Sequence, residues 1–83
     1  MFDLTNKVIV ITGGSGKLGQ KHAEAVARFN AIPIILDLPN MNVEKVANRI
    51  RKEFQVMSIG LEVDITVESQ VEKCCRRLVK KFR

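Results

Sequence analysis

Three glycines at fixed spacing lie near the start of the chain, between an apolar stretch and a helical pattern. Gly14, Gly16 and Gly19 match the pattern G-x-G-x-x-G. Glycine permits a tight turn and lets a phosphate approach the backbone, and a helix N-terminus offers N–H groups and a favourable dipole. The pattern predicts a dinucleotide pyrophosphate site. Because three such glycines recur by chance, the prediction depends on the elements around them.

A carboxylate follows the glycine turn at the spacing that an adenosine ribose requires. Asp37 ends an apolar stretch about twenty residues after the turn, where it can accept both ribose hydroxyls. Its charge would repel a 2′-phosphate, which favours NAD over NADP. The Lys17 ammonium could reach such a phosphate, so NADP stays an alternative. The simpler interpretation makes Asp37 an acidic loop residue before Pro39.

A second carboxylate, Asp64, follows the third apolar stretch in the segment Val63–Thr66. The carboxyl ends of parallel strands meet at one edge of a sheet, where ligands of such folds bind. Asp64 could therefore receive the adenine amino group. A role in ending the strand or capping the next helix is an alternative that spacing alone does not separate.

Six elements must position these residues. Short Val- and Ile-rich runs predict buried strands, and apolar residues at helical spacing predict amphipathic helices. The expected strands are 7–11, 32–36 and 56–63. The first two expected helices are 18–29, ended by Asn30 in a left-handed conformation, and 43–54. The last expected helix has Thr66 as its N-cap, and its inward-facing residues are Val67, Val71, Cys74 or Cys75, Leu78 and Phe82. This order predicts an α/β fold with a parallel three-stranded sheet in the order 3-2-1, flanked by helices.

Composition narrows the partners. The net charge of +5 is concentrated near the C-terminus. The basic residues there lie opposite an apolar stripe, and the chain has no tyrosine or tryptophan to stack on bases. We therefore expect a solvated helix face rather than a nucleic-acid surface. The basic residues are Lys73, Arg76, Arg77, Lys80, Lys81 and Arg83.

The cysteines and the apolar runs limit the environment. Cys74 and Cys75 are adjacent, which suits packing and a reducing compartment and lacks the spacing of a metal site. No run approaches the roughly 18 apolar residues of a membrane helix, and Asp3 precedes any apolar stretch. We expect a cytoplasmic protein without signal peptide, membrane segment or metal.

A nucleotide triphosphatase loop is the rival interpretation of Gly16-Lys17. That loop needs glycine where Ile11 stands and a hydroxyl where Leu18 stands. Without the hydroxyl a magnesium ligand is missing, so the dinucleotide interpretation is preferred.

The chain resembles, over its whole length, the N-terminal part of the short-chain dehydrogenase/reductase family. The matching residues are Asp3-Leu4, Lys7 to Gly14, Asp37 and Val63 to Thr66. The resemblance implies that residues 1–83 form the N-terminal half of an NAD(P)-binding Rossmann domain, a βαβαβα half. It also implies a pyrophosphate at the glycine turn, ribose at Asp37, and adenine beside Asp64-Ile65. The expected cofactor-binding residues are Gly13, Ser15, Gly16, Lys17, Leu18, Gly19, Asp37, Leu38, Asp64 and Ile65.

The resemblance leaves the branch of the family open. Lys17 replaces a glycine of the common T-G-x-x-x-G-x-G pattern, and the spacing T-G-x-x-G-x-x-G resembles the extended branch of nucleotide-sugar epimerases and dehydratases. The family's catalytic tyrosine, from Y-x-x-x-K, has no counterpart here. We therefore expect a fragment without catalytic residues. Its parent would be an oxidoreductase with a small-molecule substrate and a homo-oligomeric assembly, and a non-catalytic nucleotide-binding or interaction module is the alternative.

Overall fold

Residues 4–82 are described by the structure, a computed structural model, and Asp3 and Arg83 lie outside them. The predicted order of elements is confirmed. The elements are β1 (Val8–Thr12), α1 (Lys17–Arg28), β2 (Ile32–Asp37), α2 (Val43–Phe54), β3 (Ile59–Glu62) and α3 (Glu68–Phe82). Asn30 follows α1 in the predicted left-handed conformation, with φ of 69°.

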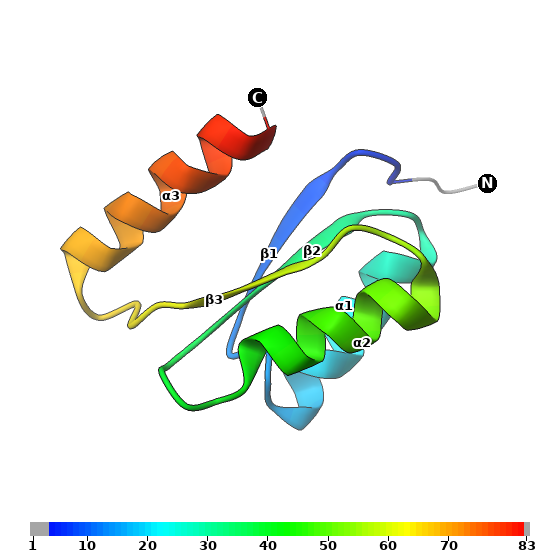
Figure 1. The fold of residues 1–83 in the computed structure, drawn as a ribbon, viewed down its shortest axis with the longest axis horizontal. Helices are drawn as coiled ribbons and strands as arrows, with labels where there is room; N and C mark the ends of the chain where they lie inside the picture. Colours follow the sequence, from blue (N-terminus) through cyan, green and yellow to red (C-terminus); the bar gives the residue numbers. More distant parts are fainter. Residues whose placement is uncertain (1–3, 83) are drawn as a thin grey trace.

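The three strands form one parallel sheet in the order β1-β2-β3 (Figure 1). Ile11 pairs with Ile35, and Leu36 pairs with Leu61. Parallel pairing brings the carboxyl ends of the strands to one edge, where residues 13, 38 and 63 leave the sheet. The predicted α/β class and strand order are confirmed.

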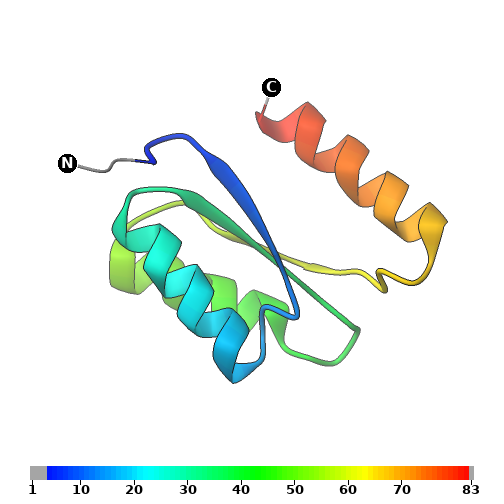
Figure 2. The same cartoon turned by 180° about the vertical axis from the view of Figure 1, so that it is seen from behind.

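Two layers of helix cover opposite faces of the sheet, with α1 and α2 on one face and α3 on the other (Figures 1 and 2). Side chains alternate along a strand. Ile35 therefore packs with Ala23 and Ile50 under α1 and α2, whereas its neighbours Ile34 and Leu36 pack with Cys74 of α3. Burial on both faces explains why the β2 sequence is continuously apolar.

The first strand is less buried than its Val- and Ile-rich run predicts. β1 is an edge strand, and along it only Ile11 is buried while Val10 is 47% exposed. An apolar groove of about 420 Å³ runs between β1 and α3, lined by Val8, Val10, Cys75, Leu78, Val79 and Phe82. Cys74 is buried and Cys75 exposed, as the packing interpretation of the pair predicts.

The third strand begins at Ile59 rather than near Val56, because Pro33 prevents earlier pairing. The Ile32 N–H donates to the Lys7 carbonyl at 2.8 Å, so strand alternation turns the nitrogen of Pro33 toward β3. Proline has no N–H to donate there. Pairing starts one residue later, at Ile34 and Ile59, and the Ser58 hydroxyl donates to the Pro33 carbonyl at 2.8 Å.

Replacing Ser58 by alanine should lower the free energy of unfolding by about 1–3 kcal/mol, because a buried carbonyl loses its donor. Ser58 is 1% exposed, so water cannot replace the hydroxyl. Urea unfolding of S58A measures the loss, and Ser69→Ala on the exposed side of α3 is the matched control, expected within about 0.5 kcal/mol of the parent. Equal stability of the two variants would contradict this account of the start of β3.

Among residues 4–82, no helix is both long and apolar enough to cross a membrane. The basic residues of α3 within this range, Lys73, Arg76, Arg77, Lys80 and Lys81, are exposed. Their exposure agrees with the expectation of a solvated helix face.

Candidate functional site

A cleft of about 250 Å³ lies at the carboxyl edge of the sheet, where the three strands end. It brings together the end of β1, the end of β2 and the segment after β3. The lining residues are Thr12, Gly13, Leu36, Asp37, Leu38, Val63, Asp64, Ile65 and Thr66. Residues separated by some fifty positions in the sequence thus meet here, because parallel strands end together.

The structure requires glycine at different positions of the turn for different reasons. Gly13 has φ of 63°, so the tight turn depends on Gly13 rather than on Gly14. A Cβ on Gly19 would lie 2.3 Å from the Gly13 carbonyl oxygen, and one on Gly14 would lie 2.6 Å from a methyl of Ile35. A Cβ on Gly16 would meet only the Gly13 oxygen, at 3.5 Å. The fold itself therefore requires little of Gly16, which leaves room for a ligand there.

The N-terminus of α1 faces the same turn. Gly16 is its N-cap, and no side chain caps it. The N–H groups in the first turn of an α-helix lack partners within the helix. In α1 these belong to Lys17, Leu18 and Gly19, and a pyrophosphate group suits such donors.

Asp37 ends β2 and accepts hydrogen bonds from both the turn and its own strand end. Its Oδ2 accepts from the Ser15 hydroxyl and from the Ser15 N–H at 3.2 Å, and its Oδ1 accepts from the Leu38 N–H at 2.8 Å. The Ser15 hydroxyl is the main cause of a lowered Asp37 pKa; partial burial opposes it, and the Leu38 and Ser15 N–H groups add to it. The carboxylate therefore stays ionised at neutral pH, as an acceptor for hydroxyl donors.

Acid should destabilise the protein partly through Asp37. The pKa of Asp37 is lower in the folded state, so the ionised carboxylate favours folding above its unfolded value of about 3.9. That contribution is lost as the pH falls through the folded pKa. Urea unfolding between pH 2 and 7 should show a shallower acid decline in Asp37→Asn than in the parent. Parallel curves would contradict the assignment, and Asp64→Asn measures the separate contribution of the other carboxylate.

Asp64 also lines the cleft and orders the chain after β3. Its Oδ1 accepts from the Thr66 N–H at 3.0 Å and from the Thr66 hydroxyl at 2.6 Å. The Thr66 hydroxyl, followed by its N–H, lowers the pKa of Asp64. The prediction of Thr66 as an N-cap is wrong: α3 begins at Glu68, and Thr66 closes a turn with Asp64. The expectation that Val67 faces inward is also wrong, because this residue precedes α3 and is 37% exposed.

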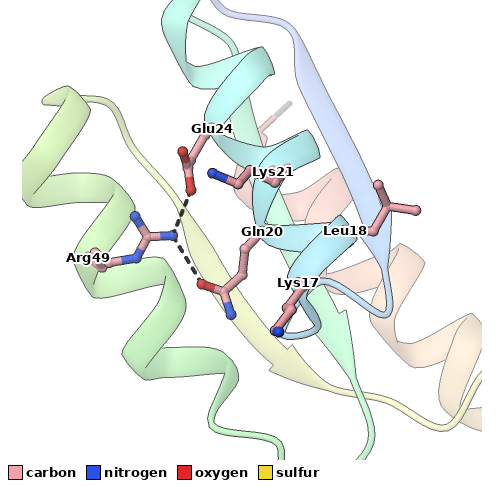
Figure 3. A pocket seen from close by; sticks show the side chains of 6 residues that line it. All are labelled: Lys17, Leu18, Gln20, Lys21, Glu24 and Arg49. Atoms are coloured by element: carbon pink, nitrogen blue, oxygen red, sulfur yellow. Dashed lines mark hydrogen bonds and ion pairs between the residues drawn. The ribbon is translucent and has the colours of Figure 1, made fainter.

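The remaining predicted residues divide between two clefts. Leu38 and Ile65 line the carboxyl-edge cleft and are 49% and 58% exposed, which leaves apolar surface for a planar ring. Lys17 and Leu18 instead line a cleft of about 640 Å³ between α1 and α2 (Figure 3). That cleft is larger, yet neither carboxylate reaches it and no strand ends there. We therefore place the candidate site at the carboxyl edge.

The sequence did not predict how Ser15 is held. Its N–H and hydroxyl donate to Asp37, and its carbonyl oxygen accepts from Gln20 Nε2 at 2.7 Å. Gln20 has no place in a glycine pattern, so no motif could identify it. Residues 4–82 contain no cluster of three or more His, Cys, Asp or Glu arranged for a metal ion.

Known proteins are similar to this chain in both sequence and fold. An NAD-dependent glycerol dehydrogenase of Listeria innocua is 31% identical over 81 residues, which are 98% of this chain and 30% of that protein. A 3-hydroxyacyl-CoA dehydrogenase type-2 of Drosophila melanogaster is 32% identical, over 95% of this chain and 29% of its own length. The NADPH-dependent 3-quinuclidinone reductase of Rhodotorula rubra superposes with a TM-score of 0.89 at 29% identity, over 99% of this chain and 31% of that one.

The chain therefore spans about a third of the length of these relatives. The family model described as short chain dehydrogenase matches residues 7–83. The glycine turn, the strand-end carboxylates and the parallel sheet all lie within the matched residues. The chain belongs to the short-chain dehydrogenase family.

Proposed function

We propose that the carboxyl-edge cleft and the adjoining glycine turn bind the adenosine diphosphate half of a nicotinamide dinucleotide. The pyrophosphate would lie against Gly13 and the segment 15–19, the adenine ribose would donate its hydroxyls to Asp37 beside Leu38, and Asp64 with Ile65 would flank the adenine. The observation that carries this proposal is the single cleft that joins Gly13, Asp37 and Asp64. The uncapped N-terminus of α1 supports it.

NAD is the preferred cofactor in this proposal. A 2′-phosphate on the ribose would approach the ionised Asp37 carboxylate, which repels it. Lys17 is exposed at the start of α1 and offers NADP a counter-charge, so NADP remains the second candidate. Relatives of both kinds exist, since one is named NAD-dependent and another NADPH-dependent.

Residues 1–83 would then be the N-terminal half of a Rossmann domain. The exposed edge of β1 supports this, because a further parallel strand can pair there. The placement of α3 on the opposite face from α1 and α2 also supports it (Figure 2). Right-handed connections require that switch of face when the chain returns to the far side of β1.

The whole protein would be a cytoplasmic oxidoreductase, a homo-oligomer with a small-molecule substrate and without nucleic-acid or membrane partners. Its relatives are named as dehydrogenases and reductases, which supports this class over the epimerase alternative. Catalysis would require an acid-base group from outside these residues, because they contain no tyrosine.

Calorimetric titration with NAD, ADP-ribose, nicotinamide mononucleotide and NADP tests the proposal. ADP-ribose should bind about as tightly as NAD, because the contacts lie at the adenosine end, and nicotinamide mononucleotide should not bind. NADP should bind more weakly than NAD. Absence of binding by ADP-ribose, or equal binding by the mononucleotide, would contradict the proposal.

A further inference from the structure

A chain of polar contacts connects α2 to the glycine turn through the cleft between α1 and α2. We propose that Gln20, oriented by Arg49, is a positioning residue that fixes the Ser15 peptide and thereby the pyrophosphate-binding shape of the turn. The proposal rests on the dinucleotide function proposed above and adds to it a residue that lies outside the ligand cleft.

Ser15 is held from two sides. Toward β2, its N–H and hydroxyl both donate to Asp37. Toward α1, its carbonyl oxygen accepts from Gln20 Nε2 at 2.7 Å. The peptide that joins Ser15 to Gly16 is therefore fixed through its oxygen, and Gly16 is the position where the fold leaves room for a ligand.

Arg49 determines which end of the Gln20 amide faces Ser15. Its Nη2 donates to Gln20 Oε1 at 3.1 Å and to Glu24 at 3.2 Å, as Figure 3 shows. Its Nη1 donates to Glu53 at 2.9 Å. A guanidinium only donates hydrogen bonds, so the amide oxygen must face Arg49. The amide nitrogen is thereby directed to the Ser15 carbonyl.

The polar network around Arg49 lies where we expect its side chains to be ordered. The Glu24 side chain is 18% exposed and that of Arg49 is 38% exposed, so solvent screens this ion pair less than one on an open surface. Two carboxylates and one amide thus share one guanidinium. A fixed Arg49 reduces the number of rotamers that Gln20 can adopt, and the turn is held in one shape before a ligand arrives.

The test compares two ligands that differ in the phosphates. Gln20→Met keeps the length of the side chain and removes both hydrogen bonds. We expect ADP-ribose to bind about 5- to 10-fold more weakly, as the loss of one net hydrogen bond implies, while adenosine binds unchanged. The ratio of the ADP-ribose dissociation constant to the adenosine dissociation constant should therefore rise by the same factor.

Gln70→Met is the matched control at the other end of the site. Gln70 Oε1 accepts the Asp64 N–H at 2.8 Å, so its loss disturbs the adenine end that both ligands share. Both ligands should weaken together, and their ratio should not change. An unchanged ratio in Q20M would overturn the proposal, as would a Q20M chain that fails to fold, since Gln20 would then be a residue of general stability.

Amide hydrogen exchange separates this inference from the proposed function. In Q20M the amides of Gly14 to Gly16 should exchange at least several-fold faster, with β2 and α2 unchanged. Arg49→Met should give a smaller acceleration, because Gln20 can still reach Ser15. If the parent chain binds neither ligand, the proposed function fails while exchange still decides the role of Gln20. Unchanged exchange in the turn would then overturn that role.

Discussion

Replacing Gly19 by alanine should lower the free energy of unfolding by about 2 kcal/mol. The added Cβ would lie 2.3 Å from the Gly13 carbonyl oxygen and 2.7 Å from the Gly14 Cα, and both atoms belong to the backbone. Overpacking of this kind costs about 1–3 kcal/mol or more. In an unobstructed helix the same change would gain about 1 kcal/mol, so even the sign of the effect is informative. Urea unfolding of G19A measures it.

Gly16→Ala is the matched control, and we expect it to weaken ligand binding while leaving the stability almost unchanged. Its Cβ makes only an ordinary contact at 3.5 Å, and its φ of −75° and ψ of 171° suit any residue. Stability should change by less than about 1 kcal/mol, whereas ADP-ribose should bind about tenfold more weakly or worse, because the methyl group occupies the space proposed for the pyrophosphate. Destabilisation of G16A as large as that of G19A would contradict the separation of the two roles.

Replacing Asp37 by alanine should weaken NAD binding by about 10- to 100-fold. Hydrogen bonds to a charged group contribute about 1.5–3 kcal/mol, and each 1.4 kcal/mol is about tenfold in affinity. NADP should lose much less, because the repulsion of its 2′-phosphate disappears with the carboxylate. Calorimetry on D37A should therefore show a marked fall in the preference for NAD.

Glu62→Ala controls for charge in this experiment. Glu62 ends β3 at the same edge of the sheet but does not line the candidate cleft. Its replacement by alanine changes the net charge by the same amount as the replacement of Asp37. E62A should bind both dinucleotides like the parent. Ser15→Ala adds a second comparison, because it removes the hydroxyl that donates a hydrogen bond to Asp37 and keeps the Asp37 carboxylate. An unchanged NAD affinity in D37A would contradict the role of Asp37.

Most of the fold could be predicted because its elements are long and strongly patterned. The continuous apolar run of β2 and the stripe of α2 with Val43, Val46 and Ile50 predicted buried elements, and these residues are buried. The meeting of Asp37 and Asp64 at one edge followed from parallel order alone. Single-residue exceptions were missed. Pro33 delays β3, and Gly60 allows close packing under α2, where a Cβ would lie 2.5 Å from the Val43 carbonyl.

The details of the site depend on contacts between distant residues that no pattern contains. The glycine pattern did not show that Gly13 makes the turn, because φ depends on how the chain enters α1. The bonds of Ser15 to Asp37 and of Gln20 to Arg49 join residues 22 and 29 positions apart. Such pairs become visible only once the sheet and the two helices are packed.

The most direct test maps the backbone amides of the chain by NMR during titration with ADP-ribose. The account predicts saturable shifts at Gly13 to Gly19, at Asp37 and Leu38, and at Asp64 and Ile65. It predicts no saturable shifts for the amides of α2, the helix on the other side of the larger cleft. Shifts confined to that larger cleft between α1 and α2, or no saturable shifts at all, would contradict the claim that the carboxyl edge binds the adenosine half of a dinucleotide.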